Sequence, residues 1–226
     1  MSLSTGRGPL SAHPAGRFSA VVPAGVSYLE PHRRRVRATK DGRTVIDTER
    51  ALLVHRPGRP PEYAFVAADV HDLPTEAQPD AEGYVRVEWD EADSWFEEDE
   101  QVLGHPRNPY HRVDCLRSGR RLRVEVADTV LVDTTDTLVV YETALEPRLY
   151  VAPEHVRTDL LVESATTTYC SYKGAATYWT AHIGEAALED VAWSYEHALP
   201  ESLPLQHHLS FDDTRVRVVC DLPPGD

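Results

Sequence analysis

The chain has 226 residues, of which 41% are hydrophobic and 27% charged, and its formal net charge at pH 7 is −14. This length accommodates one large domain or two small ones. The acidic balance argues against a nucleic-acid partner, because phosphate backbones are bound by clustered Lys and Arg. No apolar run approaches the roughly 20 residues of a membrane-spanning helix. We therefore expect a soluble globular protein with neither nucleic acid nor membrane as a partner.

The first 27 residues differ in composition from the rest of the chain. Residues 1–27 are rich in Ser, Gly, Pro and Ala and contain two Arg. They lack the apolar core of a secretory signal, and their composition is typical of a flexible tail. We expect a flexible N-terminal tail and a cytoplasmic protein.

An internal repeat follows the tail. Arg35–Val70 aligns without a gap on Arg121–Val156, so that, for example, Ile46-Asp47-Thr48 corresponds to Val132-Asp133-Thr134. Such self-similarity marks duplicated folding units. We predict a first repeat over residues 28–114, which serves as a scaffold, and a second repeat over residues 115–226, which carries the site.

Short runs of β-branched and aromatic residues alternate with turns through most of the chain, a pattern typical of strands. Strands are expected at residues 84–89, 95–96, 121–126, 129–132, 138–141, 149–151, 175–183, 189–193, 209–211 and 215–219. Short helical stretches are expected near residues 68–73, 153–156 and 200–208. The predicted fold class is mainly β, with two small antiparallel-sheet domains and short helical turns.

The cysteine content argues against disulfides and metal sites. The three cysteines are widely spaced, at Cys115, Cys170 and Cys220. A disulfide framework is not expected from an odd number without an export signal. No Cys or His pair has the short spacing of a structural zinc site, and we predict no metal and no cofactor. The histidine pairs His105/His111 and His207/His208 are interpreted as surface residues.

The second repeat inserts a polar loop that the first repeat lacks, and this loop is the candidate catalytic site. Cys170 and Lys173 flank a tight turn, where the ammonium would lower the thiol pKa and favour a nucleophilic thiolate. Alternatively, Lys173 forms a Schiff base, with Tyr172 as a proton donor. The competing interpretation is structural: Cys170 and Tyr172 pack, Lys173 reaches solvent, and Gly174 permits the turn.

Further candidates lie on the predicted strands of the second repeat. Strict alternation in residues 175–183 places Tyr178 and His182 on one face, with His182 as a catalytic base, and directs Trp179 towards the core. Glu142 and Arg148 would bind substrate, or alternatively form a surface ion pair that contributes little stability. Three aromatic residues could form a wall for a flat or cationic ligand, although core packing is the alternative for the tryptophans; they are Trp179, Trp193 and Tyr195.

These motifs resemble one bacterial family. The resemblance is carried by Cys170-Ser171-Tyr172-Lys173-Gly174, Tyr178-Trp179 and Ala192-Trp193-Ser194-Tyr195, and residues 95–114 resemble the linking segment of two-copy members. The family is catalogued as domain of unknown function 427, and some catalogues label it nucleotidyltransferase-like. The resemblance extends over residues 33–219 and departs from the family at Ser171, where members commonly have Pro.

The resemblance implies a β-tent architecture, in which two antiparallel sheets meet at an angle and often enclose an aromatic-lined pocket for a small molecule. We therefore expect two tandem β-tent-like domains. Several β-tent relatives bind zinc through paired Cys-x-x-Cys motifs, which this sequence lacks. No glycine-rich phosphate loop or paired carboxylate motif supports nucleotidyl transfer, and a shared fold does not establish a shared reaction.

The leading functional hypothesis is an enzyme that acts on a small metabolite in a pocket of the second repeat. Cys170, Tyr172, Lys173 and His182 would perform the chemistry, and the remaining candidates would bind the substrate. The first alternative is a non-catalytic module that binds a small ligand against Trp179, Trp193 and Tyr195. The second is a structural protein whose duplicated units form an assembly interface. No reaction type is predicted.

Overall fold

The computed structural model describes residues 17, 19–21, 23 and 25–222. Most of the expected flexible tail, residues 1–27, lies outside these described residues. The chain divides into two compact units between Tyr110 and His111, slightly before the boundary expected from the sequence. We call the part up to Tyr110 the first unit and the part from His111 the second unit.

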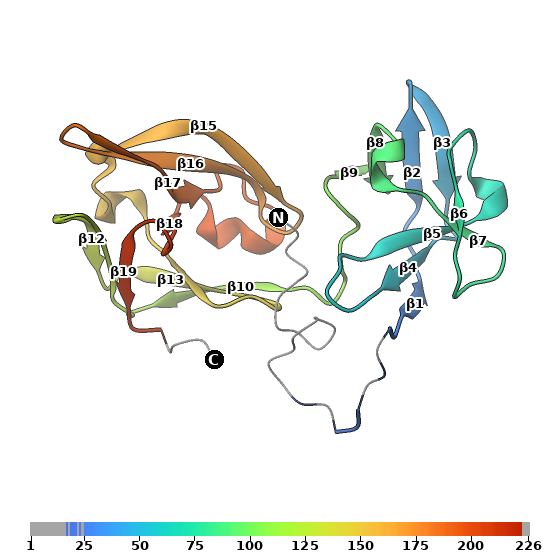
Figure 1. Cartoon of the computed structure of the whole chain (residues 1–226), viewed down its shortest axis with the longest axis horizontal. Coiled ribbons are helices and arrows are strands. Elements are labelled where there is room, and N and C mark those ends of the chain that lie inside the picture. The colour runs from blue at the N-terminus through green and yellow to red at the C-terminus, as the bar shows by residue number, and fades with distance from the viewer. Residues whose placement is uncertain (1–16, 18, 22, 24, 223–226) are drawn as a thin grey trace. The chain divides into compact units, whose positions relative to one another are not determined.

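Strands dominate both units, and the predicted mainly β class is confirmed (Figure 1). Every strand pair in the described chain is antiparallel. The helical segments of the described chain are short 3₁₀ turns: η2 (Ala67–Asp69), η3 (Trp89–Glu91), η4 (Pro153–His155), η5 (Thr158–Leu160) and η6 (Pro200–Leu205).

The first unit contains two sheets. One sheet has the strand order β1-β4-β5-β7-β6 and the other has the order β3-β2-β8-β9. The strands are β1 (Tyr28–Pro31), β2 (Val36–Lys40), β3 (Arg43–Thr48), β4 (Leu52–His55), β5 (Glu62–Val66), β6 (Glu76–Ala77), β7 (Tyr84–Arg86), β8 (Ser94–Glu97) and β9 (Glu100–Val102).

The second unit contains three sheets, with the strand orders β10-β13-β14, β12-β11-β19 and β15-β16-β17-β18. The strands are β10 (Val113–Ser118), β11 (Leu122–Val126), β12 (Thr129–Thr134), β13 (Thr137–Glu142), β14 (Arg148–Tyr150), β15 (Leu161–Cys170), β16 (Gly174–Ile183), β17 (Ala186–Ser194), β18 (Leu209–Phe211) and β19 (Arg217–Cys220).

The repeat seen in the sequence is reproduced in the pairing register. Strands β4 and β5 pair Leu53 with Tyr63, and β13 and β14 pair Val139 with Leu149, each residue 86 positions later. Both copies also have a bulge at the same place, after Ala38 in the first unit and after Val124 in the second. A bulge is a specific backbone feature and not a consequence of composition, so the copies share one scaffold.

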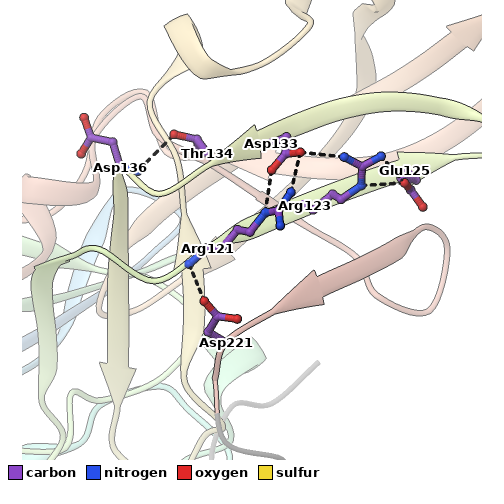
Figure 2. A network of polar contacts seen from close by, with 7 residues as sticks. All are labelled: Arg121, Arg123, Glu125, Asp133, Thr134, Asp136 and Asp221. Carbon is purple, nitrogen blue, oxygen red and sulfur yellow. Dashed lines mark hydrogen bonds and ion pairs between the residues drawn. The ribbon is translucent and has the colours of Figure 1, made fainter.

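The basic residues at the start of each repeat form matching surface ion pairs. Arg35 binds Asp47 through two nitrogens, and Arg121 binds Asp133 in the same way. In the second unit Arg123 also contacts Asp133 (Figure 2), and the two guanidinium groups lower the pKa of Asp133 to about 2. Arg121 lies just before β11, and its side chain is 54% exposed.

Each unit has its own apolar core, and the two cores use equivalent positions. Alternation directs most of these side chains to one face of their strand, and the bulge lets the adjacent residues Val45 and Ile46, like Leu131 and Val132, both be buried in the core. The equivalent core residues are Val36 and Leu122, Ala38 and Val124, Val45 and Leu131, Ile46 and Val132, Leu53 and Val139, Tyr63 and Leu149, and Phe65 and Val151.

The second unit differs by a long antiparallel hairpin that follows the repeated scaffold. In Figure 1 the strands β15, β16 and β17 run side by side as the longest strands of this unit. Trp179, Ala181 and Ile183 of β16 pack in or against the core, which confirms the predicted alternation. The turn between β15 and β16 carries the polar loop.

Candidate functional site

The turn between β15 and β16 is short and tightly packed. Cys170 pairs with Gly174 across the hairpin, so residues 171–173 form the turn. Gly174 has a φ of +103°, and a Cβ added there would lie 2.8 Å from the carbonyl oxygen of His197. The backbone N–H of Leu199 donates a hydrogen bond to the carbonyl oxygen of Lys173, at 3.1 Å. The turn is therefore held against the segment that leads into η6.

Lys173 forms a buried ion pair with Glu142 at the end of β13. The side chains of Lys173 and Glu142 are 8% and 4% exposed, and the ammonium bonds to Oε2 of the carboxylate. Burial raises the pKa of Glu142, but the hydrogen bond from His111 and the charge of Lys173 outweigh it, so the pKa is lowered. Burial likewise opposes the charge of Lys173, yet Tyr150 and Glu142 favour it and raise its pKa. The expectation that Lys173 reaches solvent is wrong.

His111 completes a cluster around the carboxylate. Its Nε2 lies 3.0 Å from Oε1 of Glu142, its side chain is 8% exposed, and its ring stacks on Tyr172 with centroids 3.7 Å apart. The interpretation of His111 as a surface residue is wrong, because its side chain is buried against Tyr172 of the polar loop. We call Glu142, Lys173, His111, Tyr172 and Tyr150 the Glu142 cluster.

Tyr150 connects this cluster to partly exposed residues. Its buried hydroxyl accepts a hydrogen bond from the indole N–H of Trp193, at 3.1 Å, and burial raises its pKa. The guanidinium of Arg148 lies 5.2 Å from the Trp193 ring centroid, a cation–π contact. The side chain of Arg148 is 44% exposed; it lies 3.7 Å from Asp213 and donates a hydrogen bond to the carbonyl oxygen of Phe211 at 3.5 Å, and both contacts are long.

Cys170 lies beside the cluster but does not have the properties of a nucleophile. It is 5% exposed, and burial raises its pKa even though the charge of Lys173 acts in the opposite direction. The same cause raises the pKa of Cys115 on β10. A thiolate is the reactive form of cysteine, so both environments disfavour attack by sulfur. All three cysteines are free thiols.

The other aromatic residues predicted for the site have different environments. Tyr195 is buried, with the ammonium of Lys173 5.9 Å from its ring centroid, and Tyr178 pairs across the sheet with Trp193 and reaches the hydroxyl of Thr168. Trp179 packs against the core and donates to Ser194.

His182 lies away from the polar loop. It is exposed and eight residues along β16 from Gly174, which corresponds to about 26 Å. Therefore the structure brings Cys170, Tyr172, Lys173, Glu142, Tyr195, Trp193 and Arg148 together and leaves His182 outside.

Comparison of the two units shows which of these residues the scaffold does not require. At the positions of Glu142 and Arg148 the first unit has Arg56 and Glu62, so each position carries the opposite charge. Arg56 and Glu62 form an ion pair with each other. At the position of Tyr150 it has Ala64. Comparing the copies position by position would have found Tyr150. His111 precedes the aligned segments, so only the fold reveals it.

Two features are absent from the described residues. These residues contain no group of three or more His, Cys, Asp or Glu side chains arranged to hold a metal ion. Across residues 25–222 and the few described before them, no helix is long and apolar enough to cross a membrane.

Comparison with known proteins places the cluster within a family. No curated protein matches the chain. Residues 114–222 match the family described as a domain of unknown function, DUF427, and this segment contains the whole Glu142 cluster except His111. The resemblance inferred from the polar loop is thereby confirmed over residues 114–222, which make up slightly less than half of the chain.

Proposed function

We propose that the second unit binds a small anionic metabolite beside the Glu142 cluster and transfers protons there. The observation that carries this proposal is a buried carboxylate that contacts both an ammonium and an imidazole. Buried charges are costly to keep, and groups with perturbed pKa values concentrate at functional sites. At the position of Glu142 the first unit has Arg56, so the shared scaffold does not require a carboxylate there.

The cluster favours proton transfer over covalent catalysis. The raised pKa of Cys170 keeps its thiol protonated at neutral pH, and the raised pKa of Lys173 keeps its amine from acting as a nucleophile. A Schiff base requires the neutral amine. We therefore no longer propose Cys170 or Lys173 as nucleophiles. In this proposal Lys173 keeps Glu142 in its charged form.

His111 is the candidate general base. When its Nε2–H donates to Glu142, its Nδ1 carries the lone pair, and the carboxylate holds the ring in one tautomer. A carboxylate that orients an imidazole in this manner is a recurrent catalytic arrangement. Tyr172 stacks on the same ring and restricts its orientation.

Arg148 and Trp193 are the candidate binding residues. Arg148 is partly exposed and its ion pair with Asp213 is long, at 3.7 Å. Guanidinium groups bind carboxylates and phosphates with two parallel hydrogen bonds. The ring of Trp193 lies below the guanidinium and bonds to Tyr150. A ligand with an acidic group on Arg148 would thus lie next to the proton-transferring groups.

The test measures thermal stabilisation by acetate, phosphate and small hydroxy and keto acids. We expect at least one of these probes to raise the melting temperature of the wild-type protein and of Cys170→Ala. The shift should be lost in Arg148→Gln and Glu142→Gln. Arg56→Gln is the matched control, since Arg56 occupies the Glu142 position in the first unit. Loss of the melting-temperature shift in Cys170→Ala would show that the thiol takes part in binding. An equal loss in Arg56→Gln would refute a binding site confined to the second unit.

A further inference from the structure

A pocket of about 190 Å³ opens in the first unit, which the sequence suggested was only a scaffold. Its wall is formed by three segments: residues 59–63 leading into β5, residues 86–89 from β7 into η3, and residues 104–106 after β9, together with Trp95 of β8. Since liquid water occupies about 30 Å³ per molecule, this volume suits a molecule with a single ring. The residues that match the DUF427 family lie entirely outside it.

Aromatic rings form the apolar wall of this pocket. Trp89 and Trp95 stack with centroids 5.0 Å apart, and Tyr63 lies 6.4 Å from Trp89 and 6.0 Å from Trp95. Two of their three polar side-chain groups are already used: Trp95 donates to the carbonyl of Trp89 at 2.9 Å, and Tyr63 donates to the buried Glu97 at 2.7 Å. Trp95 and Tyr63 therefore present only their rings to the pocket.

The shared scaffold does not require these aromatic residues. The second unit has Leu149 at the position of Tyr63. In the first unit Trp95 of β8 pairs with Ala38 of β2. In the second unit Val218 of β19 pairs with Val124 of β11, the counterpart of Ala38, so Val218 takes the place of Trp95. Aliphatic side chains therefore complete the same core in the second unit, and the aromatic wall is a separate property of the first.

The electrostatic environment of the pocket is acidic. Residues 72–100 contain twelve Asp and Glu and a single basic residue, Arg86. The guanidinium of Arg86 is neutralised by Glu76, whereas the lining residue Glu88 is exposed and has no ion pair within the described residues. Within the lining itself Arg59 and Arg86 stand against Glu62 and Glu88, so the negative excess comes from the surrounding segment. Such a field attracts cations, and aromatic faces stabilise them.

We propose that the first unit binds a small organic cation, a protonated or quaternary amine bearing a single ring, in the pocket formed by Tyr63, Trp89 and Trp95 with Glu88 at its rim. The ring packs against the partly exposed Trp89, behind which the buried Trp95 and Tyr63 complete the wall, and the ammonium lies towards Glu88. This site is independent of the Glu142 cluster, and it gives the duplicated protein a second ligand of the opposite charge.

The experiment uses the full chain and three probes that share one ring but differ in charge: benzylammonium, benzyl alcohol and benzoate. The four tryptophans are divided equally between the units, so the indole N–H signals in a ¹H–¹⁵N spectrum report on both at once. We expect saturable shifts of Trp89 and Trp95 with benzylammonium, shifts at least about five-fold weaker with benzyl alcohol, and none with benzoate. Trp179 and Trp193 should remain unchanged with benzylammonium.

Two variants test the charge and the ring separately. Glu88→Gln should weaken benzylammonium binding about five-fold or more, whereas Glu82→Gln, an exposed acid of the same segment outside the pocket, should leave it unchanged. Trp89→Ala should abolish binding while the Trp95 signal stays dispersed, because the Trp95 bond is to the backbone of residue 89. Equal binding of the three probes, equal effects of Glu88→Gln and Glu82→Gln, or shifts confined to Trp179 and Trp193 would overturn the proposal.

Discussion

At Gly174 two independent constraints act on a single residue. Its φ of +103° lies in a region that L side chains rarely adopt, and a Cβ would approach the carbonyl oxygen of His197 to 2.8 Å. Backbone oxygens held in a packed segment cannot move away as a flexible side chain can. The interpretation of Gly174 as the residue that permits the turn is therefore confirmed, and the position of Lys173 depends on it.

Replacing Gly174 should destabilise the second unit. We expect Gly174→Ala to lower the free energy of unfolding by about 1–3 kcal/mol through backbone strain alone, and by more if the contact with His197 is not relieved. Urea unfolding followed by circular dichroism measures the change. The control is Gly119→Ala, where no atom lies within 4 Å of the added Cβ and the effect should stay within about 0.5 kcal/mol. Equal losses in both variants would contradict the prediction.

The cysteines provide a test of residue environment. Because burial raises the pKa of Cys170 and it is 5% exposed, a smaller fraction is thiolate at pH 7 to 8 and iodoacetamide has poor access. We expect Cys170 to be alkylated more slowly than the partly exposed Cys220, as read by mass spectrometry of the peptides. In urea the rates should converge. Rapid labelling of Cys170 in the folded protein would show an activated thiolate.

At the scale of elements, the Glu142–Lys173 pair joins β13 of the repeated scaffold to the inserted β15–β16 hairpin. Strand β15 was not predicted, because most of its residues are exposed and its Thr-rich sequence lacks the alternation of a half-buried strand. The sequence identified the turn but not the strand that leads into it. A buried ion pair now fixes that hairpin to the scaffold.

Breaking this pair from one side should cost more than removing it entirely. Lys173→Met leaves the Glu142 carboxylate buried without its cation, and we expect a loss of about 3–5 kcal/mol in unfolding free energy. Glu142→Met combined with Lys173→Met removes both charges and should recover much of that loss. Arg148→Met, at a partly exposed side chain, is the control and should have little effect on stability. A double variant less stable than Lys173→Met would be contrary to this expectation.

A second buried carboxylate, in the first unit, predicts a pH dependence of stability. Burial opposes the charge of Glu97, but contacts with His32, Tyr63 and Arg34 lower its pKa to about 2. The charged form therefore stabilises the fold fully above the unfolded pKa of about 4.3, and this stability is lost as the pH falls towards 2. The slope from this group is at most about 1.4 kcal/mol per pH unit.

The measurement compares urea unfolding of the wild type with two variants between pH 5 and pH 2. Glu97→Gln should reduce the acid-induced loss of stability, because the group no longer takes up a proton on unfolding. Glu100→Gln, an exposed neighbour, should leave the slope unchanged. The same slope in the wild type and in Glu97→Gln would show that other groups govern acid unfolding.

At the scale of the whole molecule, duplication provides two scaffolds that have equivalent cores but differ in the residues around those cores. The positions that face each core keep apolar side chains in both units. The surrounding positions diverge: the second unit acquires the Glu142 cluster, and the first unit acquires an aromatic pocket. Packing constrains core volume and leaves the other positions free to change.

Because its core and sheets are drawn from its own residues, the second unit should fold alone. The core residues of this unit run from Leu122 to Val216. We expect a fragment of residues 111–226 to give the same Trp179 and Trp193 indole signals as the full chain and a cooperative urea transition. A fragment beginning at residue 115, the boundary expected from the sequence, lacks His111 and should be less stable, since Glu142 then loses one partner. An unfolded fragment 111–226 would contradict this assignment.

The sequence alone determined four properties of this protein. They are the repeat, the mainly β class, the face of β16 that meets the core and the family of the second repeat. These properties depend on local periodicity and on identities at a constant spacing, which survive in a linear chain. Which polar groups meet was decided only by the tertiary structure. His111, Glu142, Tyr150 and Lys173 come from four separate segments, and their burial, pairing and pKa values arise only when those segments pack together. The aromatic pocket of the first unit arises in the same way.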